Sequence, residues 1–469
     1  MMKNLLFTLL FLTISIFSIA QLHYTKISAG SEFSMALRSD SSLWAWGFNG
    51  NGQLGINSTT SQNSPVIVDS TSKWVNVSAG AWHCLAIKAD GTLWAWGLNS
   101  QGQLGDGSIS QKLSPVQIGN AANWMTISSG QAHSLALKTD STLWAWGYNM
   151  VGSVGDSTTI NKLVPTAIMP SKRWISISAG GAHSLAIDDA HHLFAWGDNS
   201  TNQLGDSTTV KKLIPTKIGT DNNWDKVSAG FQFSTAIKIN HTIWSWGFNG
   251  NAQLGLGTTT NAKAPIQIGT ASDWKIIAAG ASFGFAIKND SSLYGWGYNG
   301  QGQLGTGDKL QKKTPIQIGD DEDYISISPA VGFYYNGVYG LHSLALHATA
   351  DMVCASGANY VGQLGDGTTT TSNIFICNTG ILTGIENTPI ENDDFLSIFP
   401  NPSTGVFQIA SQDIIKSIEI FDSFGKLIMK IDAVHKTHTT INLGDYTAGL
   451  YFVRILTKES YFDKKLVIY

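Results

Sequence analysis

The chain repeats one pattern every 50 residues. The motif Trp-Gly-x-Asn recurs without drift, and its glycine falls at six evenly spaced positions: Gly47, Gly97, Gly147, Gly197, Gly247 and Gly297. A seventh copy, at Gly357, comes ten residues late, and Ser356 replaces its tryptophan. A fixed period of this length is typical of small units that bury their apolar faces by stacking on one another. The fold must therefore be a row or a ring of similar units.

Each repeat reads as four short β-strands. In one copy they cover residues 74–80, 83–88, 93–96 and 115–118, and the turn residues Asp90-Gly91 mark a hairpin. Six of the eleven prolines open the fourth strand: Pro65, Pro115, Pro165, Pro215, Pro265 and Pro315. Because proline has no N–H for a ladder, this strand is predicted to be the outer edge. Small residues after the first strand predict that it is the innermost one.

Four antiparallel strands repeated about an axis make a β-propeller. The repeats open at seven aromatic residues: Tyr24, Trp74, Trp124, Trp174, Trp224, Trp274 and Tyr324. The sequence thus predicts an all-β chain with a seven-bladed propeller. An open solenoid is the alternative, but it needs atypical capping repeats, and the first repeat here is regular.

The composition narrows the function. Charged residues make up 13% of the chain and the net charge is −4, which disfavours nucleic-acid binding. Three cysteines do not form a disulfide framework. Cys354 and Cys377 fall in neighbouring strands of the last repeat, so a bridge between them is left open, whereas Cys84 is predicted to pack as a small apolar residue.

Residues 1–20 have the pattern of a signal peptide. Lys3 precedes an apolar stretch, and Ser18-Ile19-Ala20 is a small-x-small cleavage site. An N-terminal membrane anchor is the alternative, but the apolar stretch is short for a span. The prediction is a secreted or cell-surface protein with no transmembrane span after signal removal.

The repeats resemble those of the regulator of chromosome condensation. The resemblance lies in Ser178–Ala186 (Ser-Ala-Gly-x-x-His-Ser-Leu-Ala), Trp94–Asn99 and Gly102–Gly105, and it covers about residues 22–378. It implies a seven-bladed propeller. The family's eukaryotic founder is an exchange factor for a nuclear small GTPase, and a secreted relative inhibits β-lactamases. A fold shared by such different activities does not by itself indicate the function.

Residues 396–469 resemble the C-terminal sorting domain of type IX secretion. The resemblance rests on Phe399–Ser403 with Gly405, on Gly449–Val453, and on the terminal Lys464–Ile468. It implies export across the outer membrane through the secretion machinery, followed by release of the cargo or its attachment to the cell surface. The alternation of this segment predicts a small antiparallel β-sandwich. Residues 379–395 are predicted to form a flexible linker.

Three histidines share one column of the repeat, at His83, His133 and His183. A metal site built from adjacent blades is one reading. A buried histidine bonded to backbone in each unit is the better one, because the column continues as phenylalanine in other repeats. Aspartates after the Leu/Val-Gly loop (Asp106, Asp156, Asp206 and Asp366) are predicted to cap turns rather than to bind calcium. No metal or cofactor is expected.

Catalytic motifs are missing from the sequence. It holds no Gly-x-Ser-x-Gly elbow, no His-Glu-x-x-His and no paired-carboxylate column. Ser134, Ser184 and Ser343 follow histidines, but neighbours in a strand point to opposite faces, so no dyad is predicted within a blade. The chain is predicted not to be an enzyme.

Binding is predicted where the repeats differ, in the connections between first and second strands. The seventh of these swells to residues 331–340. An aromatic patch is expected there: Trp82, Phe231, Phe333, Tyr334, Tyr335 and Tyr339. Aromatic clusters on a surface are typical of partner sites. That the insertion plugs the axis or repairs a degenerate blade is the alternative.

The sequence therefore predicts an exported, non-enzymatic propeller that binds an extracellular protein or glycan. A cell-surface carbohydrate-active hydrolase, or its binding subunit, is one alternative. A regulator of a small GTPase is another, which the export signals disfavour. The ligand, the fate of the sorting domain and the oligomeric state are left open.

Overall fold

The computed structural model describes residues 22–320, 323–332, 341–348, 352–378, 396–399, 403, 405–422, 426–444, 446–447, 449–457 and 461–468. The predicted signal peptide and linker, and four of the predicted patch residues (Phe333, Tyr334, Tyr335 and Tyr339), lie outside the described residues.

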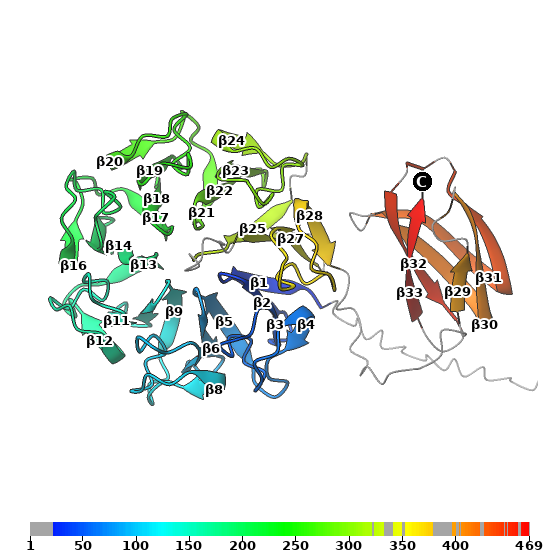
Figure 1. The fold of residues 1–469 in the computed structure, drawn as a ribbon, viewed down its shortest axis with the longest axis horizontal. Helices are drawn as coiled ribbons and strands as arrows, with labels where there is room; N and C mark the ends of the chain where they lie inside the picture. Colours follow the sequence, from blue (N-terminus) through cyan, green and yellow to red (C-terminus); the bar gives the residue numbers. More distant parts are fainter. Residues whose placement is uncertain are drawn as a thin grey trace, which may run out of the picture.

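The repeats fold into seven four-stranded antiparallel sheets, arranged as a ring (Figure 1). Strand bounds, blade by blade, are β1 (Tyr24–Ala29), β2 (Phe33–Arg38), β3 (Leu43–Gly47) and β4 (Gln62–Ile67); β5 (Trp74–Ala79), β6 (His83–Lys88), β7 (Leu93–Gly97) and β8 (Lys112–Gln117); β9 (Trp124–Ser129), β10 (His133–Lys138), β11 (Leu143–Gly147) and β12 (Lys162–Ile168); β13 (Trp174–Ala179), β14 (His183–Asp188), β15 (Leu193–Gly197) and β16 (Lys212–Lys217). The last three blades hold β17 (Trp224–Ala229), β18 (Phe233–Lys238), β19 (Ile243–Gly247) and β20 (Ala262–Gln267); β21 (Trp274–Ala279), β22 (Phe283–Lys288), β23 (Leu293–Gly297) and β24 (Lys312–Gln317); β25 (Tyr324–Pro329), β26 (His342–His347), β27 (Val353–Gly357) and β28 (Ser372–Asn378).

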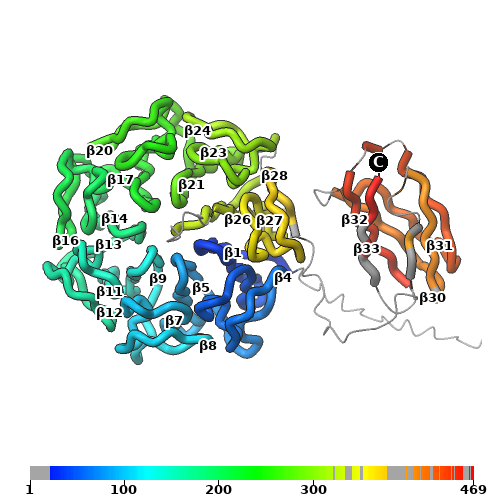
Figure 2. The backbone as a smooth tube through the Cα atoms, in the orientation of Figure 1, coloured from blue at the N-terminus to red at the C-terminus, as the bar shows by residue number. Residues whose placement is uncertain are grey.

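The strands of every blade follow one another in sequence order across the sheet. The first strand of each blade lies nearest the axis and the fourth lies at the periphery (Figure 2). The repeated prolines, such as Pro65 in β4, sit in this outer strand, as predicted for a residue that cannot donate to a ladder. The predicted all-β, seven-bladed propeller is confirmed, and the open solenoid is wrong.

The ring closes between blades 7 and 1 with the bonds that join other blades. The amide of Ala29 donates to Ser328 Oγ at 3.0 Å, and the indole of Trp46 donates to the carbonyl of Gln363 at 2.9 Å. Equivalent bonds join blades 1 and 2, where the amide of Ala79 donates to Ser28 Oγ at 2.8 Å. Among the described residues, closure therefore uses the same kind of contact that joins the other blades.

One junction lacks this amide-to-serine bond. Six of them circle the axis, but between blades 6 and 7 the donor position holds Pro329 and the acceptor position holds Ala278. Proline has no N–H and alanine has no hydroxyl, so donor and acceptor are lost together. A lone buried donor or acceptor costs more than losing both partners.

This pairing predicts the effect of removing one acceptor. We expect Ser228→Ala to lower the free energy of unfolding by about 1 kcal/mol, because the amide of Ala279 keeps its donor and loses Ser228 Oγ at 2.9 Å. Urea unfolding measures the change. The reverse substitution, Ala278→Ser, serves as the control, and we expect it to bring no gain because Pro329 offers no N–H.

The core lies between blades. The second tryptophan of each Trp-x-Trp pair, including Trp96, Trp146 and Trp246, is fully buried. The buried clusters of the propeller join neighbouring sheets; for example, Leu135 and Val154 of blade 3 pack with Trp174 and Trp196 of blade 4. Because each blade buries its apolar face only against a neighbour, the ring is stable only as a whole.

The C-terminal region is a five-stranded sheet that bends around its own core. Its strands are β29 (Leu396–Phe399), β30 (Val406–Phe421), β31 (Leu427–Asn442), β32 (Gly449–Leu456) and β33 (Tyr461–Ile468). The first half of β30 pairs with β29 and the second half with β32, while β31 pairs along both halves. Side chains from these strands form one buried cluster that includes Phe407, Ile418 and Val453.

Helices are missing from the described part of the chain, and with them any helical segment able to cross a lipid bilayer.

Candidate binding face

Two sets of loops open on one face of the propeller. In an antiparallel meander, the turn between strands one and two lies at the same end as the turn between strands three and four. The first set includes Trp82, between β5 and β6, and Phe231, between β17 and β18. The second set follows each Trp-Gly-x-Asn motif. We call this end of the ring the loop face.

Trp82 is partly buried at the loop face, where its ring meets Phe48 of the preceding blade edge-on. The ring centroids are 5.4 Å apart and the planes make an angle of 76°. The carbonyl of Trp82 accepts the amide of Leu98 at 2.8 Å. Its backbone is therefore held in place and the side chain is presented on a rigid support, which lowers the entropy lost on binding.

Phe231 lies three blades away from Trp82, in blade 5. Its amide donates to the carbonyl of Gly280 at 3.3 Å, and its ring packs on the bare backbone of Gly181, where a Cβ would come within 2.9 Å of Cδ2. The structure therefore does not bring the two described patch residues together.

The insertion of the seventh repeat begins over the axis. Gly332, the last described residue before it, approaches Ser31 of blade 1, and a Cβ there would come within 3.3 Å of the Cβ of Ala81 in blade 2. The insertion therefore starts beside the central opening. That position is compatible with binding and with a plug, so both readings stay open.

Sequence reasoning missed most of the apolar side chains on the loop face. Phe48, Tyr148, Phe248 and Tyr298 occupy the variable place in Trp-Gly-x-Asn and are partly buried. Met150 and Tyr360, two residues further on, are 62% and 55% exposed. These residues stand at or near the variable position of an otherwise fixed motif, and that variability is the signal that could have found them.

The tips of the second loop set carry exposed aliphatic residues. Four of them are between 62% and 69% exposed: Ile109, Ile160, Val210 and Leu310. Single exposed apolar residues are common on proteins. Their repetition in four blades at one end of the ring is what makes the loop face unusual.

The column histidines are buried and neutral, and they bond to a neighbouring blade. His83 Nε2 lies 3.0 Å from Ser134 Oγ, and His133 Nε2 lies 2.9 Å from Ser184 Oγ. His183–Ser234 and His342–Ser34 repeat the contact at the same range. The predicted bond to backbone is therefore wrong, because the partner is a serine hydroxyl across the interface.

Burial lowers the pKa of these imidazoles. The pKa of His83 falls to about 3 because desolvation penalises the charged ring, and that of His183 falls to about 4, again chiefly by desolvation. Each ring has no exposed surface. A histidine–serine pair that neither solvent nor substrate reaches serves to join blades.

A serine faces each of the four column histidines. Where phenylalanine replaces histidine, the facing residue is Cys84 opposite Phe33 and Gly284 opposite Phe233, but it stays a serine, Ser343, opposite Phe283. Cys84 is a buried free thiol, as predicted. The Cys84 S–H donates to the carbonyl of Gln53 at 3.2 Å, and burial raises its pKa well above the usual value.

The loop aspartates cap turns, as predicted, and several also hold a lysine. Asp106 Oδ1 accepts the amide of Ser108 at 2.9 Å, and its other oxygen lies 3.1 Å from Lys112 Nζ. Asp156 and Asp206 have matching lysines, Lys162 and Lys212. At these three loops, the ammonium group of the lysine balances the charge of the aspartate.

A disulfide joins Cys354 of β27 to Cys377 of β28, which settles the pairing that the sequence left open. The two residues are direct partners in the antiparallel ladder. The bridge therefore fastens the outer edge strand of the last blade to its neighbour.

Together these features define a closed seven-bladed propeller whose repeated columns are used for packing and whose loop face differs from blade to blade. Residues 15–278 match the RCC1-like domain, and residues 274–303 and 290–332 match the regulator of chromosome condensation (RCC1) repeat. The first match covers more than half of the chain, so the chain belongs to the RCC1-like domain family. No curated protein matches it.

The C-terminal region has a family of its own. Residues 397–469 match the secretion system C-terminal sorting domain, as the sequence resemblance predicted. A sorting domain of this kind indicates export and attachment to the cell surface.

Solved structures agree on the fold. Yeast RCC1 (Prp20), in its complex with Kap60, is 18% identical with a TM-score of 0.63, over 81% of this chain and 87% of that chain. Prp20p from Saccharomyces cerevisiae, in a structure described with its binding properties to Gsp1p and histones, gives 18% and 0.63 over 80% and 90%. Human WBSCR16 is 21% identical with a TM-score of 0.60, over 66% of this chain and 85% of that chain. These identities show a common fold alone.

Proposed function

We propose that the chain is an exported, non-enzymatic propeller that binds an extracellular protein through its loop face. The observation that carries the proposal is the set of exposed apolar side chains gathered at that end: Met150, Tyr360 and the four aliphatic loop tips. An aqueous surface that repeats such residues from blade to blade favours a partner that covers them.

A protein partner fits these side chains better than a glycan. Aliphatic residues and methionine pack against other apolar side chains, whereas sugars are bound by flat aromatic platforms beside polar groups. Trp82 and Phe48 offer one such platform, so glycan binding is kept as an outcome of the test rather than as the proposal.

The relatives' partners do not carry over to this chain. Kap60, Gsp1p and histones belong to the yeast protein, which is 18% identical, and the sorting domain indicates an extracellular destination. Catalysis has no support among the described residues, because the histidine–serine pairs are sealed between blades. The function therefore rests on a surface and not on a reactive centre.

Substitutions at the loop face test the proposal. We expect Met150→Ala combined with Tyr360→Ala to weaken binding of the captured extracellular protein at least tenfold, because anchors in interface centres carry most of the energy. The full chain is used to capture partners from the medium and envelope of the producing cells, and the affinity of each purified partner is then measured. Met125→Ala with Ile175→Ala, exposed residues near the other end of the blades, is the matched control.

Each result decides between readings. Equal affinity for both variants and the parent chain contradicts the loop-face proposal. Binding to a glycan array that disappears with Trp82→Ala would replace the protein by a sugar. A further double variant, Tyr334→Ala with Tyr335→Ala, tests whether the insertion belongs to the binding site.

A further inference from the structure

The seventh blade departs from the others at one packed cluster. In blades 2, 3 and 5, a lysine at the end of the second strand lies over an aromatic ring of the third strand, with Lys88 Nζ 3.5 Å from the ring centroid of Trp94. Lys138 and Lys238 do the same at 4.1 and 3.9 Å. Blades 5 and 6 add a carboxylate: Lys238 Nζ lies 2.6 Å from Asp221, and Lys288 Nζ lies 3.2 Å from Asp273.

Blade 7 keeps this arrangement but changes its chemistry. His347 takes the place of the lysine, Asp323 takes the place of Asp273, and Cys354 takes the place of the aromatic ring. A second cysteine, Cys377, faces Cys354 from the outer strand. A packing repair would need only an apolar side chain, whereas the three changes relative to blade 6 introduce an imidazole and two sulfurs, and the aspartate is kept.

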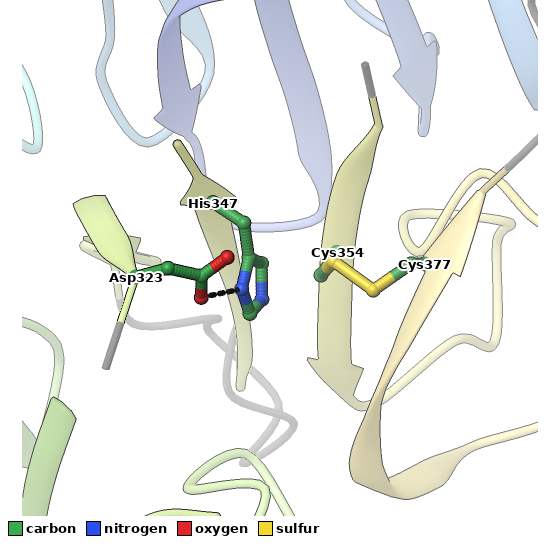
Figure 3. Close-up of a disulfide and its surroundings, with 4 residues drawn as sticks. All are labelled: Asp323, His347, Cys354 and Cys377. Carbon is green, nitrogen blue, oxygen red and sulfur yellow. Dashed lines mark hydrogen bonds and ion pairs between the residues drawn. A yellow bond between two sulfur atoms is a disulfide. The ribbon is translucent and has the colours of Figure 1, made fainter. Parts of the chain in front are cut away.

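Figure 3 shows the imidazole standing between the carboxylate and the disulfide. His347 Nδ1 lies 2.6 Å from Asp323 Oδ1, and a ring nitrogen and the two sulfurs lie within 4.8 Å of one another. In the neutral imidazole, the proton on Nδ1 that bonds the carboxylate leaves the lone pair on Nε2. Metal-binding histidines are oriented by such carboxylates.

We propose that Cys354, Cys377 and His347 form a redox-gated site for a borderline or soft transition metal such as zinc(II), occupied when the disulfide is reduced. Two thiolates and one imidazole are a donor set that zinc binds in proteins, with a fourth position open to water. Asp323 is the positioning residue. In the oxidised state shown by the structure, the sulfurs are bonded to each other and the site is closed.

The redox step is a thiol–disulfide exchange with an external dithiol. The dithiol attacks one sulfur, the Cys354–Cys377 bond breaks, and the dithiol leaves as a disulfide, which gives both cysteines back as thiols. Metal binding then releases the two thiol protons as the thiolates coordinate. The partly exposed Cys377 is the sulfur that a reductant reaches first, because Cys354 is fully buried.

Cobalt(II) titration of the full chain tests the proposal, with cobalt as a spectroscopic stand-in for zinc. We expect the chain reduced with a phosphine to give a thiolate-to-cobalt charge-transfer band that saturates at one equivalent and disappears on adding zinc. The oxidised chain gives no band. Asp323→Asn should weaken cobalt binding about 10- to 100-fold while leaving the band in place.

The repeat supplies matched variants. His347→Lys restores the residue of blades 2, 3, 5 and 6 and should abolish tight binding without loss of fold, whereas Cys84→Ala, which removes the buried thiol elsewhere, should change nothing. Absence of the band in a reduced chain that keeps its β-sheet circular dichroism overturns the proposal. Loss of the propeller on reduction overturns it as well, since the bridge would then be structural only.

Discussion

Acidification from about pH 7.5 to about pH 5 is expected to lower the free energy of unfolding by about 8 kcal/mol through four buried histidines. The four are His83, His133, His183 and His342, and burial lowers their pKa values to about 3, or about 4 for His183. Each therefore contributes about 2 kcal/mol at that pH, and urea unfolding across the range measures the sum.

The sign follows from which state binds protons. In the unfolded chain a histidine titrates near its usual pKa of 6.5, while in the folded ring it stays neutral, so stability is complete above pH 6.5 and falls below it. Loop carboxylates act lower: hydrogen bonds from Thr142 lower the pKa of Asp140, so its contribution is lost only as the pH falls below the usual 3.8. The interval from pH 6.5 to pH 5 therefore reports chiefly on the histidines, while burial raises the pKa of Glu32 above its usual 4.5 and opposes them near the lower end.

The ring contains its own control for this effect. His83→Phe with Ser134→Cys copies the pair that Phe33 and Cys84 already form. This variant should lose about 2 kcal/mol less than the parent between the two pH values. An unchanged slope would mean that His83 does not take up a proton on unfolding.

Trp146→Ala is expected to destabilise the propeller by about 4 kcal/mol, because truncating a fully buried tryptophan leaves a cavity. Its indole lies in the interface of blades 2 and 3 and donates to the carbonyl of Gln103 at 2.9 Å. That carbonyl still accepts Ser134 Oγ at 2.8 Å, so the loss comes mainly from packing. Equilibrium urea unfolding gives the value.

Trp144, two residues earlier in β11, is the comparison. It is only partly buried, and its ring stays in contact with Lys138. Trp144→Ala should therefore cost about 2 kcal/mol or less. Equal losses of unfolding free energy for the two variants would contradict the conclusion that the buried Trp146 stabilises the interface more than Trp144 does.

The propeller could be predicted because its sequence pattern occurs several times. The 50-residue period, the proline of the fourth strand and the aromatic residue that begins each repeat all recur, so a chance match in one repeat is outweighed by the other repeats. The Cys354–Cys377 bridge could not be settled in this way, since it occurs once and depends on the register between β27 and β28. The contact between His83 and Ser134 was missed because it crosses from one blade to the next.

The candidate site was less predictable than the fold. Trp82 was found because it breaks the column pattern, but its neighbour Phe48 belongs to a motif that looked purely structural. The sequence also did not reveal how blade 7 compensates for its missing tryptophan. Phe375 of β28 covers Gly305, as tryptophans cover the matching glycines in other blades. Ser356 Oγ keeps the hydrogen bond to the carbonyl of Gln303 at 3.0 Å. Because these two residues occur in one repeat only, the repeating pattern of the sequence does not point to them.

The junction between blades 6 and 7, where Ala278 faces Pro329, has fewer hydrogen bonds than the junction between blades 7 and 1. It lacks the amide-to-serine bond, the histidine–serine pair and the indole donor that the junction between blades 7 and 1 retains. Ser343 and Ser356 still donate to the carbonyl of Gln303 across this junction, at 2.8 and 3.0 Å, and Phe375 packs over Gly305. We therefore expect the contact between blades 6 and 7 to open at a lower temperature than the contact between blades 7 and 1.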